Sequence, residues 1–459
     1  MPRPAILETA IANPPAKARA RRTLALASLA HATHDGLTDM IYVLLPVWQT
    51  QFALDYGALA VLRALYVGAL AVLQVPAGHL ARYLNARTVL ALGTLLCAAG
   101  YALAGLSGSL AGLCAALAVA GAGGATQHPL ASAAVSSAYS NAARGPLGTY
   151  NFAGDLGKAA IPPAVSLLLT VTDWRTTLWV IAGLGSVVAL LIRWLMPPVT
   201  NPPAVRQPTP SAATAGKGGF GLLLAIGVLD SAARMGFLLF LPFLLQAKGA
   251  PLTTIGLALS LVFIGGACGK AACGWFGARA GLPATVIATE VGTAAAILTI
   301  LALPLAPTLA ALPLLGLLLN GTSSVLYGTV PEFAASAKLP RAKLPRAKFP
   351  RAKLPRAKVA HASISPTSVA DASVERASVQ KASVAPAKIE RASIERAFAL
   401  FYTGTLGSSA LAPVLYGWVG DAAGPAWATT TAAATALAVV PLAVLLSPRL
   451  ASVARADHS

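Results

Sequence analysis

The chain has 459 residues, of which 56% are hydrophobic and only 11% are charged. Soluble globular proteins carry about 25% charged residues, so a chain of this composition cannot cover a water-facing surface and is expected to lie in a membrane. The formal net charge of +19 would suit nucleic acid, but the Lys and Arg residues gather between the apolar segments. No nucleic-acid partner is therefore expected.

Twelve apolar segments are long enough to cross a bilayer, which takes roughly 20 helical residues. A predicted cytoplasmic tail, 1–22, precedes them, because it holds Pro and Arg without the short apolar core of a removable signal. A second tail, 448–459, follows them. The predicted spans are 23–50, 58–80, 86–107, 109–138, 145–170, 174–195, 219–247, 252–278, 282–304, 306–330, 393–420 and 424–447.

The basic residues predict the orientation of these spans. If the amino terminus is cytoplasmic, 28 of the 34 Lys and Arg residues fall in inside segments and only Arg175 and Lys248 fall outside. An excess of positive charge on the cytoplasmic side is the rule for helical membrane proteins. We therefore expect a multi-pass protein of the bacterial inner membrane with both termini in the cytoplasm.

Six prolines mark the segment 196–218 as a cytoplasmic linker between two halves, 23–195 and 219–447. The halves resemble each other: span five reads Gly-Asp-Leu-Gly-Lys at 154–158, and span eleven reads Gly-Thr-Leu-Gly-Ser at 404–408. Such internal repeats are typical of secondary transporters, which bind their solute between the repeats. The predicted fold class is an all-α membrane protein with twelve transmembrane helices in two pseudo-symmetric six-helix halves.

The segment 338–392 is a low-complexity basic loop, predicted to be cytoplasmic, between spans ten and eleven. It begins with repeats of Ala-Lys-Leu-Pro-Arg, and proline at every fifth position prevents a continuous helix. One hypothesis is contact with anionic lipid headgroups. The other is a repeat expansion that has no role.

Nine ionisable residues other than histidine lie well inside the predicted spans. A charged side chain at the centre of a membrane helix costs roughly 2.5–3.5 kcal/mol on insertion scales, so these side chains are expected to face the bundle interior or a watery cavity. They are Asp35, Asp39, Arg63, Asp155, Lys158, Asp230, Arg234, Lys270 and Glu290. The sequence names no partner for Glu290.

Span one is the candidate for proton coupling. His31, Asp35 and Asp39 recur at four-residue intervals on one helical face, and His34 lies beside them. Two carboxylates one turn apart in a medium of low dielectric constant repel each other, which favours proton binding by one of them. We assign proton coupling to Asp35, Asp39 and His34. The alternative is that the carboxylates pair with Arg63 or Lys158 and never titrate.

Polar residues on five other spans are the candidates for solute binding. Arg63 and Gln74 lie three turns apart on span two, and four cations in the centre of the bundle favour an anionic solute. The alternative is that the charges form structural pairs at helical spacing, Asp155 with Lys158 and Asp230 with Arg234. The candidate set is Arg63, Gln74, His128, Asn151, Asp155, Lys158, Asp230, Arg234 and Lys270.

Most of the aromatic side chains near span ends are assigned to the interfacial belt of a membrane protein, and only Tyr66 and Tyr402 stay candidates for solute binding. The four cysteines lie inside apolar segments and lack the spacing of metal ligands, so no metal site and no cofactor are expected. The belt residues are Tyr42, Trp48, Tyr66, Tyr101, Trp179, Trp194, Tyr327, Trp418 and Trp427.

Six plus six spans, a central linker and a basic turn after span two resemble the major facilitator superfamily. Gly78, Leu80 and Arg87 match the signature that follows span two, although Arg82 stands where the family has Asp and Asn85 replaces the second Gly. The copy after span eight keeps Gly274, Arg279 and Gly281 but has Ala278 at the acidic position. The resemblance implies a gating role for Gly78, Arg82, Arg87, Gly274 and Arg279.

Three further motifs resemble the fosmidomycin-resistance-like branch, whose members are proposed exporters. They are His34-Asp35, Gln127-His128-Pro129 and the stretch 152–158. The resemblance implies a monomeric, non-enzymatic secondary transporter that moves a small solute by alternating access. Proton coupling and export of an anionic solute are the favoured details. The alternative function is a non-transporting scaffold or sensor built on a transporter fold.

Overall fold

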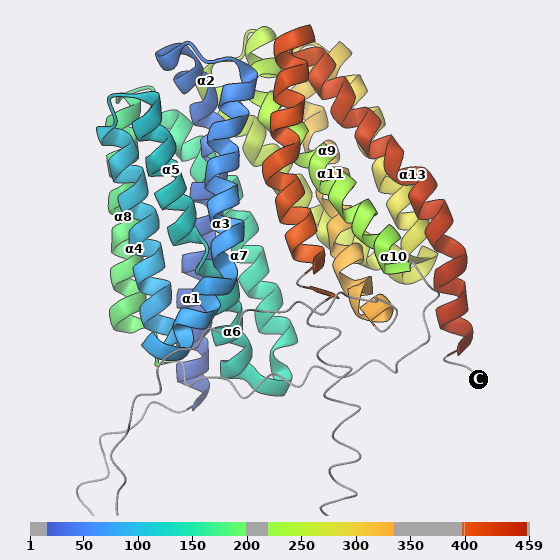
Figure 1. The fold of residues 1–459 in the computed structure, drawn as a ribbon, viewed down its shortest axis with the longest axis horizontal. Helices are drawn as coiled ribbons and strands as arrows, with labels where there is room; N and C mark the ends of the chain where they lie inside the picture. Colours follow the sequence, from blue (N-terminus) through green and yellow to red (C-terminus); the bar gives the residue numbers. More distant parts are fainter. Residues whose placement is uncertain (1–15, 199–218, 335–396, 399, 457–459) are drawn as a thin grey trace, which may run out of the picture.

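The computed structural model describes residues 16–198, 219–334, 397–398 and 400–456. Every regular element in these ranges is helical, and the helices run side by side between two ends of one bundle (Figure 1). Helix is present in each of the twelve predicted spans. Most of the linker 196–218, the loop 338–392 and parts of both tails lie outside the described residues, so the expectations about them stay predictions.

The amino-terminal half contains the first eight α-helices and one short 3₁₀ turn. Helix α1 begins seven residues before the expected span, since the run Ala-Lys-Ala-Arg-Ala-Arg-Arg consists of good helix formers. The elements are α1 (Ala16–Asp39), α2 (Ile41–Phe52), α3 (Tyr56–Leu84), α4 (Ala86–Leu106), α5 (Leu110–Gly124), α6 (Gln127–Tyr139), η1 (Ser140–Ala142), α7 (Arg144–Leu168) and α8 (Trp174–Leu195).

The carboxyl-terminal half follows the same plan. Its helix α10 joins predicted spans eight and nine, and the two are separated by a kink at Gly281, whose φ of 80° is a left-handed conformation that glycine adopts without strain. The elements are α9 (Gly219–Ala247), α10 (Leu252–Ala302), α11 (Leu305–Ala334), a helical segment over 400–423, and α13 (Pro425–Ala456).

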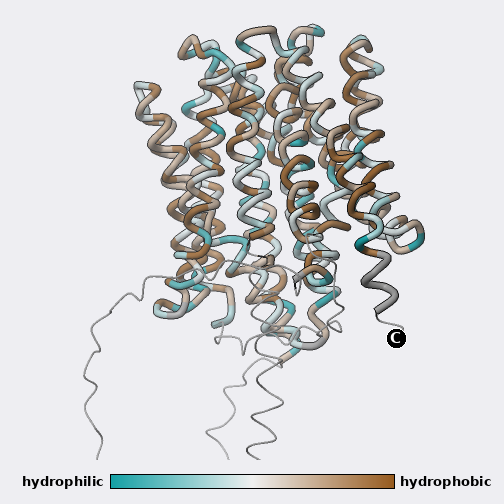
Figure 2. The backbone as a smooth tube through the Cα atoms, turned by 45° about the vertical axis from the view of Figure 1, so that its right-hand side comes forward, coloured by the Kyte–Doolittle hydropathy of each residue, from teal (hydrophilic) through white to brown (hydrophobic). Residues whose placement is uncertain are grey.

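Length and composition identify the bundle as membrane-spanning. Eight helices within the described residues are long and apolar enough to cross a bilayer, and Figure 2 shows hydrophobic residues along most of their length. Large apolar side chains such as Val72, Trp194 and Leu411 are exposed on the outside of the bundle, which is where lipid would cover them. Helices α1 and α7, which carry Asp35, Asp39, Asp155 and Lys158, are not among the eight.

Two spans that the sequence predicts as continuous each contain a local irregularity, although the backbone stays in the right-handed helical region through both. Predicted span one divides at Met40 into α1 and α2, six residues before Pro46, which cannot donate a backbone hydrogen bond. Predicted span four divides between Gly124 and Gln127, after a glycine pair that weakens a helix. Both irregularities lie next to the polar residues of the candidate site, and backbone hydrogen bonds from Met40 to Gly36 and from Ala125 to Gly121 continue the helices there.

The two halves share one hydrophobic core at the end of the bundle that is opposite to the chain ends. That core combines residues of both halves, for example Tyr42 and Trp48 with Phe240 and Phe243. Toward the chain ends the buried residues divide into two clusters, one made only of residues 26–196 and the other only of residues 220–446. The halves are therefore packed together at one end and separate at the other, as Figure 1 shows.

Glycines allow α1 and α7 to approach closely enough for their charged side chains to pair. A Cβ atom built on Gly157 would lie 1.8 Å from the carbonyl oxygen of Ala32, and one on Gly154 would lie 2.8 Å from Oδ2 of Asp35. A larger residue at Gly157 would require a shift of the backbone, whereas one at Gly154 would displace the side chains of His31 and Asp35. Gly157 thus fixes the distance at which Lys158 reaches the carboxylates of α1.

We expect Gly157→Ala to lower the thermal stability of the purified protein, because overpacking of a close helix contact costs about 1–3 kcal/mol. The matched control is Gly183→Ala on α8, where a Cβ atom meets nothing within 4 Å. The measurement is the melting temperature of both variants in the same detergent. An equal effect of the two substitutions would contradict close packing of α1 against α7.

Candidate functional site

Lys158 connects the two carboxylates of α1. Its Nζ atom lies 3.5 Å from Oδ2 of Asp35 and 3.6 Å from Oδ2 of Asp39. Both carboxylates are buried, whereas the Lys158 side chain is 30% exposed. The two carboxylates lie on one face of α1, as their spacing predicted, and both pair with a cation from α7.

Arg63 on α3 completes the charge balance at Asp39. Its Nη2 atom lies 3.4 Å from Oδ1 of Asp39 and donates a hydrogen bond of 3.1 Å to the hydroxyl of Tyr42. The guanidinium carbon also lies 4.7 Å from the centre of the Tyr42 ring. The Nε and Nη1 atoms of Arg63 are buried without a hydrogen-bond partner.

The assignment of Tyr42 to the interfacial belt is wrong. The side chain is buried in the bundle, where it contacts Arg63, and its hydroxyl donates a 3.4 Å hydrogen bond to the sulfur of Met235 in the other half. The sequence contained a signal that was missed: Tyr42 stands three positions after Asp39 and so lies on its helical face.

Three histidines surround the Asp35 carboxylate. Nε2 of His31 lies 3.4 Å from Oδ1 of Asp35, and Nε2 of His128 lies 3.9 Å from the same atom. The rings of His31 and His34 each lie 5.2 Å from the ring of His128. On its other side, Nδ1 of His31 is hydrogen-bonded at 2.8 Å to the backbone carbonyl of Tyr150.

His31, Asp35 and His128 are also the one group of side chains in the described ranges with the geometry of a metal site. Their potential ligand atoms lie within 4.8 Å of one another, although the sequence predicted no metal. The ammonium group of Lys158 already lies 3.5 Å from Asp35. A divalent cation would be repelled by that charge, so the arrangement does not favour a metal ion.

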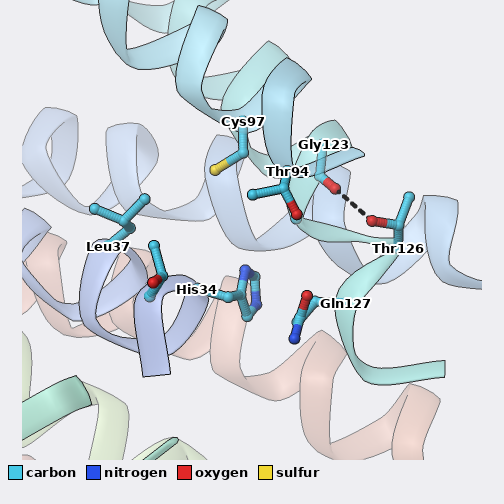
Figure 3. Close-up of a pocket in the computed structure, with 9 residues that line it drawn as sticks. His34, Leu37, Thr94, Cys97, Gly123, Thr126 and Gln127 are labelled. Carbon is cyan, nitrogen blue, oxygen red and sulfur yellow. Dashed lines mark hydrogen bonds between the residues drawn. The ribbon is translucent and has the colours of Figure 1, made fainter. Parts of the chain in front are cut away.

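A small cavity opens beside His34. Figure 3 shows His34 and Gln127 pointing toward it from α1 and from the start of α6, with Thr94 and Cys97 on α4. Between α5 and α6, the hydroxyl of Thr126 donates to the carbonyl of Gly123. The Gln127 amide nitrogen is buried without a partner, so the cavity contains a free hydrogen-bond donor.

An ion pair joins the two halves near the middle of the bundle. Nζ of Lys270 on α10 lies 2.6 Å and 2.8 Å from the two carboxylate oxygens of Asp155 on α7. The structure therefore does not contain the alternative pairing of Asp155 with Lys158 as a salt bridge. Helical spacing brings those two side chains together along α7, but each has a closer partner of opposite charge on the neighbouring helix.

A second group of charges lies inside the carboxyl-terminal half. Nη2 of Arg234 lies 3.8 Å from Oδ2 of Asp230, as the helical spacing predicted, and Nη1 donates to Oδ1 of Asn320 at 3.4 Å. Glu290 on the second part of α10 accepts a hydrogen bond of 2.9 Å from the hydroxyl of Thr322 and is a neighbour of Asp230. The structure thus supplies the partners of Glu290 that the sequence did not.

Several predicted residues are not part of these groups. Gln74 is half-buried on α3, and Asn151 is exposed on α7. A Cβ atom at Gly78 or Gly274 would meet nothing within 4 Å.

The basic residues of the two turns make local contacts. Arg87 donates to the carbonyl of Met196 at 3.0 Å, and the guanidinium of Arg279 lies over the ring of Trp275. The side chain of Arg82 lies outside the described residues. Among the described signature residues, no hydrogen bond or ion pair joins one half to the other, so their gating role stays a prediction.

A contact that the sequence did not predict closes the end opposite to the chain ends. The Asp421 carboxylate, in the carboxyl-terminal half, accepts hydrogen bonds from the backbone nitrogens of Tyr56 at 2.6 Å and Gly57 at 2.9 Å. These nitrogens are free donors in the first turn of α3, where a negative charge is favourable. A Cβ atom on Gly417 would lie 2.8 Å from the Cα of Gly57, so the backbones meet directly.

Comparisons with known proteins agree with this architecture. The sequence profile described as the Major Facilitator Superfamily matches residues 27–347. No curated protein matches the chain.

Solved structures give the same result for the fold. A bacterial homolog of the human lysosomal transporter Spinster, in an inward-facing and unoccupied conformation, is 13% identical with a TM-score of 0.65, covering 96% of this chain and 98% of that one. A mutant of the nucleoside transporter NupG is 14% identical with a TM-score of 0.64, covering 94% and 99%. At these identities the likeness concerns the fold alone.

We expect Asp421→Ala to loosen the closed end. Loss of a helix-capping carboxylate costs about 0.5–2 kcal/mol, and one or two kcal/mol changes an equilibrium roughly 5–30-fold. Spin labels at the exposed positions Gln51 and Ala422 would report the change as a larger share of long distances. The control is Asp173→Ala, because Asp173 caps α8 within its own half. An unchanged distance distribution in Asp421→Ala would refute the closing role.

Proposed function

The chain belongs to the major facilitator superfamily, and we propose that its buried charge network couples proton movement to the export of a small anionic solute. Membership makes it a non-enzymatic, multi-pass membrane protein and a secondary transporter that works by alternating access. The identity of the solute class, the coupling ion and the direction of transport are our proposals. They rest on the residues of α1, α3 and α7.

The observation that carries the anionic solute is the incomplete hydrogen bonding of Arg63. Two of its three guanidinium nitrogens are buried without an acceptor, and a buried charged donor without an acceptor is costly. Carboxylate and phosphonate oxygens match the fork of an Arg side chain. Lys158, which is partly exposed between Asp35 and Asp39, would supply a second positive charge to the same ligand.

Proton coupling is supported by the hydrogen bonding of His31. A neutral imidazole has one N–H group, and Nδ1 faces the carbonyl of Tyr150, which can only accept. Nε2 then faces the Asp35 carboxylate with a lone pair unless the ring carries a second proton. His31 and Asp35 therefore attract each other only when a proton lies between them. This adds His31 to the proposed coupling residues Asp35, Asp39 and His34.

We further propose that both termini are cytoplasmic and that the separate ends of the halves face the cytoplasm of a bacterial cell. The distribution of Lys and Arg supports this orientation. The motifs shared with the fosmidomycin-resistance-like branch support export. We propose a monomer, since each half supplies its own charge group and the pair of Asp155 and Lys270 joins them within one chain.

The competing function is a membrane scaffold or sensor that binds a ligand without moving it. Its support is the sequence departure at Arg82 and Ala278, where the family signature has acidic residues. A transporter moves solute and protons across a sealed membrane, whereas a sensor moves neither. Transport in proteoliposomes separates the two.

We expect Asp35→Asn to abolish transport driven by a pH gradient, with a loss of about tenfold or more, while exchange of solute without a gradient continues. The Asn side chain cannot bind the proton that couples the two movements. The assay follows proton movement in sealed proteoliposomes after addition of phosphonates, organic acids or sugar phosphates. Gradient-driven transport at the wild-type rate in Asp35→Asn would sink the coupling proposal. No movement with any compound would favour the sensor.

We expect Arg63→Ala to weaken binding of an anionic compound roughly 10–100-fold, because hydrogen bonds to a charged group contribute about 1.5–3 kcal/mol. The measurement is the ligand-induced rise in melting temperature of the purified protein across the same three compound classes. Arg175→Ala is the control, since Arg175 lies at the start of α8 and donates to the carbonyl of Ser107. Equal loss in both variants, or stabilisation by neutral compounds only, would contradict an anion site at Arg63.

A further inference from the structure

The carboxyl-terminal half contains a pair of buried carboxyl groups that the coupling residues of α1 do not use. Asp230 on α9 is 5% exposed and Glu290 on α10 is 2% exposed. Their side chains are neighbours in the bundle interior. Two buried carboxylates side by side repel each other, which favours a proton on one of the two.

The hydroxyl groups around Glu290 also lack enough hydrogens for their contacts. Oγ1 of Thr322 lies 2.7 Å from Oγ1 of Thr289 and 2.9 Å from Oε1 of Glu290, but its single hydrogen serves only one of these neighbours. The hydroxyl of Thr289 donates to carbonyls of its own helix, the shorter bond being 2.8 Å to Thr285. A proton on Glu290 supplies the missing donor.

The count of charges in the described network also favours one bound proton. Five carboxyl groups face four Lys and Arg side chains. Four of the five carboxyl groups lie in salt bridges: Asp39 with Arg63, Asp35 and Asp39 with Lys158, Asp155 with Lys270, and Asp230 with Arg234. Glu290 lies in no salt bridge with any of the four cations. An unpaired carboxylate in this environment would carry a large desolvation cost, which one bound proton removes.

No further cation among the described residues that face the pair can take the place of that proton. Arg234 is the charged neighbour on α9, and the polar neighbours are Asn320, Thr322 and Tyr327 on α11. Tyr327 in turn contacts Thr405 of the segment 400–423.

The other packed elements add little charge. The membrane part of α13, residues 425–447, has no ionisable side chain, and α2 presents the hydroxyl of Tyr42 through Met235. On α7, Lys158 faces Arg234 but pairs with Asp35 and Asp39. On the first part of α10, Lys270 pairs with Asp155.

We propose that Asp230 and Glu290 bind one proton between them in this conformation and form a second proton site, in the half opposite to Asp35. The site lies beside Arg234. The contacts of Arg234 to Asp230 and Asn320 are long, at 3.8 Å and 3.4 Å, and its Nε atom is buried without a hydrogen-bond partner. Release of the shared proton leaves two carboxylates beside one guanidinium, which binds Arg234 more firmly. The existence of this site does not depend on which solute the protein moves.

Infrared spectroscopy of the purified full-length protein tests the proposal directly, because a protonated carboxyl group has a carbonyl band that a carboxylate lacks. We expect such a band at neutral pH, its loss at high pH, and its absence in Glu290→Gln. Asp230→Asn should shift or remove the same band. The exposed carboxyl of Asp173, in the control Asp173→Asn, should leave it unchanged. A band that survives in both Glu290→Gln and Asp230→Asn would overturn the proposal.

The pH dependence of stability provides a second measurement. The folded pair retains a proton that carboxyl groups of the unfolded chain release above about pH 4–5, so the stability that it confers decreases as pH rises. Glu290→Gln keeps a donor toward Asp230 without a titrating group. We therefore expect it to fold, to match the wild type at low pH and to exceed it at high pH.

Failure of Glu290→Gln to fold would show that this position requires a charge and would refute the proposal. So would a melting temperature of Glu290→Gln that runs parallel to that of the wild type across the pH range. Both measurements use protein without solute or gradient. A failure of proton-driven transport therefore leaves their result unaffected, and the two proposals can fail separately.

Discussion

The salt bridges from Lys158 to Asp35 and Asp39 are the interactions on which the amino-terminal half depends. Charges inside a membrane protein are tolerated when they are paired and enclosed, and this pairing requires α7 to lie against α1 at backbone contact distance. Gly157 provides that distance. Arg63 then joins α3 to the same carboxylates, so one set of charges determines how three helices are arranged.

The need to pair buried charges also connects the two halves. Asp155, one turn before Lys158, pairs with Lys270 across the interface. The halves also share a hydrophobic core and the contact of Asp421 with the start of α3 at one end, while their cores separate toward the chain ends. An alternating-access transporter must break and remake the contacts at one end while the centre stays connected. Ion pairs suit that centre because each charge can exchange one partner for another.

The two halves share a fold but differ in chemistry. The amino-terminal half has two carboxylates balanced by Lys158 and Arg63, with histidines beside them. The carboxyl-terminal half has two carboxyl groups, Asp230 and Glu290, beside the single cation Arg234. The repeat therefore gives the scaffold, and the substitutions on it give each half its own balance of charge and protons.

Hydrophobic length, charge distribution and the internal repeat determined the fold class, since a bilayer allows few alternatives to long apolar helices. Helical spacing also identified the face of His31, Asp35 and Asp39 and the pair of Asp230 with Arg234. Only the tertiary structure decided the partners across helices: Lys158 with α1 rather than Asp155, Tyr42 with Arg63, and Glu290 with Asp230. Spacing along one helix is a local property that a sequence contains. Which charges meet across two helices depends on their rotation and separation, which packing of the whole bundle sets.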